Sequence, residues 1–221
     1  MKEDVLFCWS GGKDSAMALH ALRLAGDCRI TALLTTVTDK YDRISMHGVR
    51  RALLDRQAES LGLPLHPVLI PPQCVNTIYE ERMKEALEQH VARGVRHVAF
   101  GDIFLEDLRV YREKNLAQVG MQAVFPIWKR DTRELALEFV RLGFRAIAVC
   151  VDPRVLDASF AGRELDASFF ADLPPGVDPC GENGEFHTYV FDGPLFKTPI
   201  AVRTGEKVMR DGFYFCDLLP E

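Results

Sequence analysis

The sequence predicts an α/β fold, a doubly wound parallel sheet followed by a smaller carboxyl-terminal α+β domain. Three observations support this prediction. Short apolar runs alternate with helix-like segments over the first 127 residues, which is the pattern of a parallel sheet covered by helices. A glycine-rich turn directly follows the first apolar run. Beyond residue 174 the chain becomes rich in Pro and Gly and then in strand-like segments.

Each expected strand of the larger domain is a short apolar run, and each expected helix ends at a glycine. The expected strands cover residues 5–9, 30–37, 65–70, 97–100 and 123–125. The expected helices cover residues 15–25, 49–61, 76–93 and 105–119, closed by Gly26, Gly62, Gly94 and Gly120. Residues 39–46 are polar and are expected to form a loop.

The domain boundary is expected near residue 127, which gives a larger domain of residues 1–127 and a smaller one of residues 128–221. The smaller domain should begin with a helix and a strand. These are expected over residues 130–142 and 145–151. Three further strands are expected at residues 186–191, 200–203 and 207–216, with turns at Asp192-Gly193-Pro194 and Asp211-Gly212. Such tight turns indicate antiparallel pairing.

The composition is that of an ordinary globular protein. The 221 residues are 48% hydrophobic and 27% charged, so a sizeable core can form without disulfide bonds. The formal net charge of −5 provides no basic surface, and nucleic acid is not expected as a partner. No apolar run is long enough to span a membrane, and no targeting segment is expected before the first strand. The six cysteines lack C-x-x-C spacing, so reduced thiols and a cytoplasmic location are expected.

The glycine-rich turn is the strongest functional signal, and it reads Ser10-Gly11-Gly12-Lys13-Asp14-Ser15. Gly11 and Gly12 let the backbone approach a ligand closely. The helix that follows points its free N–H groups and its positive dipole end at the same place. Lys13 adds a positive charge, and two serines add hydroxyl donors. The turn is therefore expected to bind phosphate.

Asp14 does not fit a pure anion site. A carboxylate beside phosphates is useful if it holds Mg²⁺ or caps the helix. A Walker A loop is excluded, because that motif requires Ser or Thr directly after its lysine and Asp14 stands there instead.

A second group of candidate residues follows the expected strand at residues 97–100. Gly101 would allow close approach of a nucleotide, and Asp102 or Glu106 could hold Mg²⁺ or ribose hydroxyls. The alternative is that Asp102 caps the next helix, with Glu106 and Asp107 in its first turn. Both interpretations stay open, because this loop should lie beside the phosphate loop at the carboxyl edge of the sheet.

A third loop contains His47, at the start of the helix expected over residues 49–61. His47 could contact the nucleotide, and Arg50 or Arg51 could meet a phosphate or a carboxylate substrate. Most histidines at such junctions are structural or solvated, so this role depends on location alone.

The densest polar cluster covers residues 178–188. Its glycines and Asn183 are typical of a tight loop, but a turn does not need Glu182, Glu185, Cys180 and His187 as well. Carboxylates that bind substrate are the first interpretation, a buried structural Cys180 the second and a metal site the third. The spacing matches no usual zinc ligand set, and Cys180 with His187 could also suggest a thiol nucleophile.

These motifs together resemble a known family. Residues 10–15 resemble the PP-loop, S-G-G-x-D-S, of the N-type ATP pyrophosphatases, which cleave ATP between its α and β phosphates. Residues 181–186, G-E-N-G-E-F, resemble the G-E-x-G-E-[FY] loop of the diphthine–ammonia ligase family within that superfamily. Gly101-Asp102-Ile103 and Leu108-Arg109-x-Tyr111-Arg112 also look like an interior motif of this family. The likeness spans residues 5 to about 191.

The resemblance implies a nucleotide-binding domain of the HUP-like, adenine nucleotide alpha hydrolase type, and ATP and Mg²⁺ as cofactors. It implies that Ser10, Gly11, Gly12, Lys13, Asp14 and Ser15 bind ATP, together with His47, Gly101 and Asp102. Asp14 and Asp102 would hold the metal. A substrate carboxylate would attack the α-phosphate, and ammonia or an amine would then displace AMP. The residues expected to act in catalysis are Lys13, Asp14, Glu182, Glu185 and His187, the last three by binding the acceptor or deprotonating ammonium.

The two residues after Phe186 limit what the resemblance implies about the acceptor. Members that make diphthamide tend to have an acidic residue there, whereas His187-Thr188 looks like the bacterial branch, and bacteria do not make diphthamide. The chemistry therefore transfers more directly than the substrate. The expected partners are a carboxylate-bearing small molecule or protein side chain and a nitrogen donor. Homodimerisation stays open, because the sequence has no signal of oligomeric state.

Three rival functions differ in what they require. A tRNA-thiolating enzyme shares the PP-loop but usually needs paired cysteines and a basic surface, which the sequence lacks. A glutamine-dependent synthetase needs a glutaminase domain, for which the chain has no room. A non-catalytic sensor of ATP or AMP would bind nucleotide without turnover, and it would leave the carboxylates around Glu182 unexplained.

Overall fold

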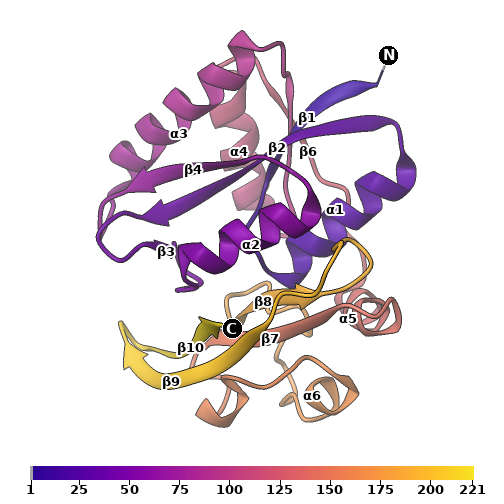
Figure 1. The fold of residues 1–221 in the computed structure, drawn as a ribbon, viewed down its shortest axis with the longest axis vertical. Coiled ribbons are helices and arrows are strands. Elements are labelled where there is room, and N and C mark those ends of the chain that lie inside the picture. The colour runs from indigo at the N-terminus through magenta and orange to yellow at the C-terminus, as the bar shows by residue number, and fades with distance from the viewer. Residues whose placement is uncertain (1) are drawn as a thin grey trace.

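The computed structural model describes residues 2–221, which form two sheets stacked end to end (Figure 1). The first sheet has six strands in the order β3-β2-β1-β5-β6, with β4 also paired to β2. The bounds are Glu3–Cys8 for β1, Cys28–Thr38 for β2, Arg43–Ile44 for β3, Leu65–Ile70 for β4, His97–Ala99 for β5 and Gln122–Val124 for β6. All of its pairings are parallel except that of β3 with β2.

Four helices cover the two faces of this sheet. They are α1 (Lys13–Ala25), α2 (Arg51–Leu61), α3 (Asn76–Ala92) and α4 (Glu106–Ala117). Alternate side chains of the strands face opposite sides: Phe7 and Leu33 pack with α1 and α2, whereas Leu6 and Leu34 pack in the cluster that includes α3. The chain runs outward from β1 in one direction and then returns to β5 on its other side. The switch point between β1 and β5 is where such sheets bind ligands.

The second sheet is antiparallel and has four strands in the order β8-β7-β10-β9. Its strands are β7 (Arg145–Val151), β8 (Phe186–Asp192), β9 (Val202–Arg210) and β10 (Phe213–Pro220). The helical segments of this part are α5 (Thr132–Arg141), the 3₁₀ turn η1 (Ala158–Phe160) and α6 (Ala167–Ala171).

The two sheets share one hydrophobic core beneath α1 and α2. Leu19 and Leu53 belong to the same buried cluster as Tyr189 and Val190 of β8. Two hydrogen bonds to backbone carbonyls reinforce the contact: Val190 N donates to Gly11 O at 2.9 Å, and the Tyr189 hydroxyl donates to Leu53 O at 2.9 Å. The carboxyl-terminal sheet therefore packs directly against the glycine-rich turn.

The predicted fold class is confirmed, and two local predictions are corrected. Residues 39–46 are not wholly a loop, because Arg43 and Ile44 pair with Thr38 and Val37 as β3. The strands expected at residues 200–203 and 207–216 have other bounds: β9 is continuous from Val202 to Arg210, and β10 begins at Phe213 after the predicted turn at Asp211-Gly212, where both residues have positive φ. All six cysteines are unpaired. Within residues 2–221, no helix combines the length and apolar character needed to cross a membrane.

Candidate active site

The glycine-rich turn joins β1 to α1 and has the geometry of an anion site. Gly11 adopts a φ of +80°, and a Cβ there would lie 2.8 Å from Gln57 Oε1, so a side chain would be strained and crowded. Gly12 is the N-cap of α1 and has no capping side chain of its own, but the Thr188 hydroxyl of β8 accepts the Lys13 N–H at 2.9 Å. The next amides of α1, those of Asp14 and Ser15, have no intrahelical partner, and both residues line a cavity. Backbone donors and the helix dipole together favour a phosphate at this place.

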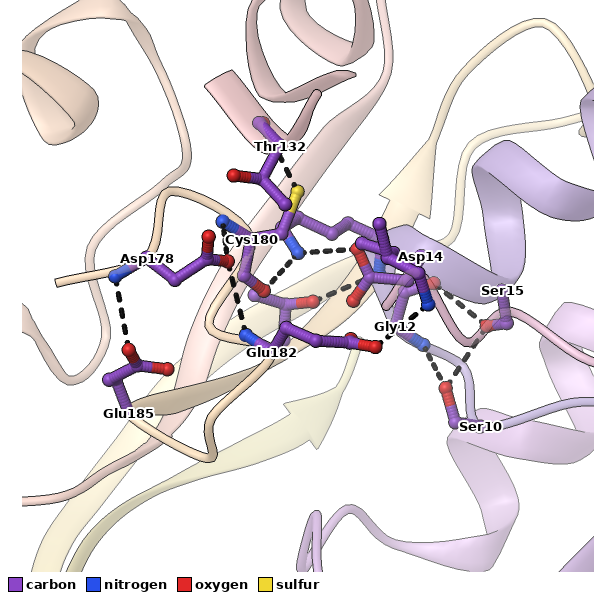
Figure 2. Close-up of polar contacts among 12 residues, drawn as sticks. Ser10, Gly12, Asp14, Ser15, Thr132, Asp178, Cys180, Glu182 and Glu185 are labelled. Atoms are coloured by element: carbon purple, nitrogen blue, oxygen red, sulfur yellow. Dashed lines mark hydrogen bonds and ion pairs between the residues drawn. The ribbon is translucent and has the colours of Figure 1, made fainter. Parts of the chain in front are cut away.

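The two serines of the turn are linked to each other (Figure 2). The Ser15 hydroxyl donates to Gly12 O at 2.9 Å, so the 3.0 Å contact between the two Oγ atoms is a bond donated by Ser10. Ser10 Oγ also accepts the Gly12 N–H at 3.3 Å. Both hydroxyls lie on the wall of the cavity, where they can exchange these internal partners for phosphate oxygens.

Lys13 is fully buried although it is charged. Its Nζ lies 2.6 Å from Asp14 Oδ1 and also donates to the backbone carbonyl of Cys180. Burial by itself would lower the pKa of Lys13, but the neighbouring Asp14 carboxylate outweighs it and the pKa is raised. Lys13 is therefore a fixed positive charge between the glycine-rich turn and the loop of residues 178–188.

The two carboxylates predicted to hold the metal, those of Asp14 and Asp102, differ in whether they have an oxygen without a hydrogen-bond partner. Asp14 keeps one oxygen beyond its bond to Lys13, and its side chain is 29% exposed to the cavity. Asp102 accepts from Arg112 with both oxygens, at 2.6 and 3.1 Å. Asp102 also does not cap a helix, because α4 begins at Glu106 with Leu105 as its N-cap. Arg112 belongs to the interior motif of the sequence, but no role was predicted for it.

Gly101 is needed for contact with the protein itself. A Cβ at this position would lie 2.8 Å from Ser15 N and 2.9 Å from the Asp14 carbonyl carbon. The end of β5 can therefore rest directly on the start of α1 only because residue 101 has no side chain. This contact brings Asp102 to the cavity beside the phosphate loop.

Glu182 connects the loop of residues 178–188 to the loop after β5. Its Oε1 accepts the Ile103 N–H at 2.7 Å and the Phe104 N–H at 3.3 Å. Burial raises the pKa of Glu182 to about 7, against the lowering effect of these two N–H groups. Glu182 lines the cavity, and a carboxyl group with this pKa exchanges a proton near neutral pH.

Glu185 lies in the same loop but serves a different purpose. Its oxygens accept the N–H of Asp178 at 3.0 Å, the N–H of Asn183 at 2.9 Å and the side-chain amide of Asn183 at 3.0 Å. Figure 2 shows Glu185 on the far side of the loop from Asp14, and it is absent from the cavity wall. The structure brings Glu182 to the site and uses Glu185 to hold the loop in shape.

Cys180 is a buried thiol, as the second interpretation of the sequence expects. Its Sγ lies 3.3 Å from Thr132 O, and burial raises its pKa far above the usual range. A protonated thiol is a poor nucleophile and a poor zinc ligand. Within residues 2–221, no cluster of three or more His, Cys, Asp or Glu side chains could hold a metal by itself.

His47 and His187 lie against each other, with ring centroids 4.6 Å apart, and both line the cavity. Burial lowers the pKa of His47 to about 3 and that of His187 to about 4. Both imidazoles are therefore neutral at pH 7. Arg50, in contrast, is turned away from the cavity and pairs with Asp217 of β10 at 2.5 Å.

The cavity has a volume of about 530 Å³ and lies at the switch point between β1 and β5. The glycine-rich turn and Glu182 form its polar side. Apolar side chains at the carboxyl end of β2 and near β3, Leu34 and Ile44, form another part of its wall. Of the predicted site residues, all except Gly11 and Glu185 line this cavity. These residues are Ser10, Gly12, Lys13, Asp14, Ser15, His47, Gly101, Asp102, Glu182 and His187.

Sequence reasoning missed two residues that hold the glycine-rich turn in place. The Gln57 amide, on α2, donates to Gly11 O at 3.0 Å and Val190 O at 2.7 Å, and it accepts from the Trp9 indole at 2.9 Å. The Thr188 hydroxyl accepts the Lys13 N–H at 2.9 Å. Gln57 had a detectable signal, because it is polar on the same helical face as Leu54 and Leu61.

Comparison with known proteins identifies relatives over nearly the whole chain. Residues 1–123 match the diphthamide synthase N-terminal domain, and residues 131–218 match the diphthamide synthase C-terminal domain. The curated relatives include three vertebrate proteins named diphthine–ammonia ligase. The chain is 30% identical to the Danio rerio protein over 222 residues, which covers 90% of this chain and 86% of that relative.

The two mammalian relatives are similar at comparable levels. Identity is 29% over 224 residues with the Bos taurus protein, covering 90% of this chain and 82% of the relative. Identity is 27% over 231 residues with the Homo sapiens protein, covering 93% of this chain and 85% of the relative. The alignments therefore include both sheets and both loops that line the cavity.

Proposed function

The chain belongs to the diphthamide synthase family, and we propose that it joins ammonia or an amine to a carboxylate that it has first adenylated. Membership makes it an ATP-dependent carbon–nitrogen ligase of the PP-loop ATP pyrophosphatase type. The observation on which the proposed mechanism depends is that the glycine-rich start of α1 lines the same cavity as Glu182. One part binds phosphates, and the other can move a proton.

ATP would lie across the switch point with its phosphates on the glycine-rich turn. The start of α1 and the hydroxyl-bearing residues Ser10 and Ser15 line this place, and the buried Lys13 ammonium is bonded to Asp14 on the same wall. The adenine would rest against the apolar side chains of Leu34 and Ile44, which line the same cavity. This placement leaves the α-phosphate near the centre of the cavity, within reach of a second substrate.

The donor set fits Mg²⁺ bound through one carboxylate and the phosphates. Mg²⁺ commonly takes one or two carboxylates together with phosphate oxygens and water. Asp14 has an uncommitted oxygen at the cavity and suits this role, whereas both Asp102 oxygens are bonded to Arg112. When bound, the ion would help neutralise the negative charge that develops on the departing pyrophosphate.

The proposed reaction has two balanced steps. The acceptor carboxylate attacks the α-phosphorus, the bond between the α- and β-phosphates breaks, and pyrophosphate leaves. Ammonia then attacks the carbonyl carbon of the acyl adenylate, the carbon–oxygen bond to AMP breaks, and the nitrogen loses a proton. Lys13 and the amides of α1 would stabilise charge in the first step. A base is needed only in the second.

Glu182 is better suited than His187 to accept that proton. A base is most effective when its pKa lies near the working pH. The pKa of Glu182 is about 7, whereas that of His187 is about 4 and makes the imidazole a weak base. We therefore assign the proton transfer to Glu182 and hydrogen bonding to the substrates to His47 and His187. Glu185 would act indirectly, by holding the loop that presents Glu182.

The acceptor is proposed by class. The vertebrate relatives are named for diphthine and ammonia, so diphthine is the first carboxylate to test with this chain. The His187-Thr188 pair after the loop aromatic distinguishes this sequence from the pattern expected of diphthamide-forming members. Other carboxylates with a similar cationic or amide-bearing side chain belong in the same test.

The experiment is product analysis with ATP, Mg²⁺, ammonium chloride and a diphthine-bearing acceptor, followed by a panel of other carboxylates. The proposal predicts AMP and pyrophosphate in equal amounts with one amide formed for each AMP. Formation of ADP and inorganic phosphate would overturn it. ATP that stays bound and uncleaved with every carboxylate would instead favour a non-catalytic nucleotide sensor.

A further inference from the structure

Arg112 is a positively charged residue of the active-site cavity that the proposed mechanism leaves without a role. Within residues 2–221, Arg112 and Lys13 are the two lysine or arginine side chains on the cavity wall. Lys13 is fully buried, and its Nζ is bonded to Asp14. The acceptor is itself an anion, and it shares the cavity with three carboxylates of the protein, those of Asp14, Asp102 and Glu182. It therefore needs a donor group of its own.

The Arg112 guanidinium is held on one edge and on one face. Its Nε and Nη2 atoms donate to the two carboxylate oxygens of Asp102, at 2.6 and 3.1 Å. Its Cζ lies 4.4 Å from the centroid of the Phe100 ring. A guanidinium fixed in this way is already ordered before a ligand binds, so little side-chain entropy is lost on binding.

The third guanidinium nitrogen, Nη1, is available for a ligand. Within residues 2–221, Arg112 donates to Asp102 alone, and Nη1 has no hydrogen-bond partner. No buried side-chain nitrogen or oxygen atom in the same range lacks such a partner. Nη1 is therefore not buried, and it reaches the open space that the Arg112 side chain lines.

Tyr79 of α3 offers a second free donor on the same wall. Among the described residues its hydroxyl has no hydrogen-bond partner, so this oxygen is not buried either. Helices α3 and α4 cover the same face of the first sheet (Figure 1). Burial and then the Cys8 thiol raise the pKa of Tyr79 to about 12, and the nearby Arg112 charge opposes them. The hydroxyl therefore stays protonated and can donate.

We propose that Arg112 Nη1 and the Tyr79 hydroxyl together bind the carboxylate of the acceptor. This assignment rests on the proposed function, since only a ligase that activates a carboxylate needs such a site. An N–H and an O–H donor suit the two lone pairs of one carboxylate oxygen and leave the other oxygen free. Asp102 balances the charge of Arg112, so the site recognises a carboxylate by directed hydrogen bonds rather than by net charge.

The proposed site lies next to the glycine-rich turn. Asp102 directly follows Gly101, where a Cβ would lie 2.8 Å from Ser15 N, so the partner of Arg112 is beside the start of α1. The free carboxylate oxygen attacks the α-phosphorus of ATP on this turn. The bond from that phosphorus to the bridging oxygen breaks, and the electron pair leaves with pyrophosphate. Arg112 and Tyr79 keep their protons throughout.

The direct test uses bromide, an anion that anomalous scattering detects, in crystals of the full chain grown with α,β-methylene-ATP. This ATP analogue cannot be cleaved between its α and β phosphates. A bromide peak is expected at Arg112 Nη1 and the Tyr79 hydroxyl, and excess acetate should displace it. Absence of the peak would overturn the proposal, and so would a phosphate of the analogue at Nη1. A peak that acetate leaves unchanged would also overturn it, because that is the behaviour of an adventitious ion only.

Tyr79→Phe gives an independent kinetic readout. The variant removes one hydrogen bond to a charged group, so the KM for the diphthine-bearing acceptor, or for whichever carboxylate the chain adenylates, should rise about tenfold. The KM for ATP should stay within about twofold, because the phosphates bind elsewhere. The matched control is Tyr111→Phe, since Tyr111 is also half-buried and does not line the active-site cavity. An equal rise in both KM values, or no rise, would contradict the proposal.

The ion pair is tested by a variant that changes both of its members. Arg112→Gln alone would leave Asp102 without its partner, whereas Asp102→Asn/Arg112→Gln keeps the net charge constant. In this double variant the bromide peak should be lost and the KM for the acceptor should rise about 30-fold. An unchanged KM in the folded double variant would count against the site. Failure of the proposed function looks different: the unaltered chain would then release no AMP or pyrophosphate with any carboxylate, whereas the bromide result does not depend on turnover.

Discussion

The glycine-rich turn and the loop of residues 178–188 line the same cavity but are built differently. The turn carries its ligand-binding features in its own sequence, namely a left-handed Gly11 and two serines bonded to each other, although Gln57 and Thr188 also hold it in place. The loop depends on an internal carboxylate, Glu185, and on Ile103 and Phe104, which are distant in the chain. The first can be identified from residue types alone. The second acquires its chemistry only through folding.

The charge of Lys13 is the strongest link between the two regions. Lys13→Ala should slow the formation of AMP and pyrophosphate by about 10²–10³-fold, because it removes the buried positive charge beside the glycine-rich turn and leaves Asp14 unpaired. Product formation in single-turnover reactions measures the effect. Lys197→Ala, at an exposed lysine, is the control. A loss of less than tenfold would mean that the turn binds phosphates without help from Lys13.

The proton-transfer role of Glu182 predicts a particular pH dependence. The carboxylate form is the base, so the rate of amide formation should rise with pH and level off above about pH 7. Glu182→Gln should lower this rate about 10²-fold and remove the inflection near pH 7. His187→Gln should keep the inflection, since the pKa of His187 is about 4. Persistence of the inflection in Glu182→Gln would assign the base to another group.

Glu185 should affect stability more than chemistry. Glu185→Ala leaves the N–H groups of Asp178 and Asn183 without an acceptor, which costs about 2 kcal/mol. For a chain of this size, the melting temperature should fall by about 4–8 °C. Calorimetry measures the melting temperature of this variant against that of Glu59→Ala, a control at an exposed glutamate on α2. An unchanged melting temperature with abolished activity would show that Glu185 takes part in catalysis directly.

Thr188 should give the smallest effect. Thr188→Val keeps the shape of the side chain but removes the acceptor of the Lys13 N–H, at a cost of about 1 kcal/mol. The KM for ATP should rise about fivefold, because the start of α1 is less firmly held. Thr204→Val, at an exposed threonine of β9, provides the baseline. A KM equal to that baseline would show that β8 does not help to order the phosphate loop.

The fold class and the glycine-rich turn could be predicted because both depend on local patterns. The alternation of apolar runs and glycine-terminated helices predicted a parallel sheet covered by helices, and Gly11 with Gly12 predicted the tight turn between β1 and α1. The short β3 escaped prediction because two residues are too few to show periodicity. The extent of β9 was misjudged because Gly205 is typical of turns and interrupts the strand pattern.

The division of labour among the carboxylates could not be predicted, because it depends on partners far away in the sequence. Glu182 and Glu185 are only three residues apart, yet one reaches Ile103 and the other closes its own loop. Nothing in the sequence shows that the Asp102 carboxylate is paired. Only the packing of α4 shows that Arg112 donates to it. Gln57 is the most instructive omission, since a polar residue on a buried helical face signals a specific hydrogen-bond partner.

The most direct test of the account separates the two half-reactions in Glu182→Gln. Exchange of labelled pyrophosphate into ATP reports adenylation at the glycine-rich turn, and amide formation reports the second step. The account predicts exchange within about threefold of the unaltered chain, together with the ~10²-fold loss of amide formation. Equal loss of both activities would contradict it, because Glu182 would then act in the cleavage of ATP.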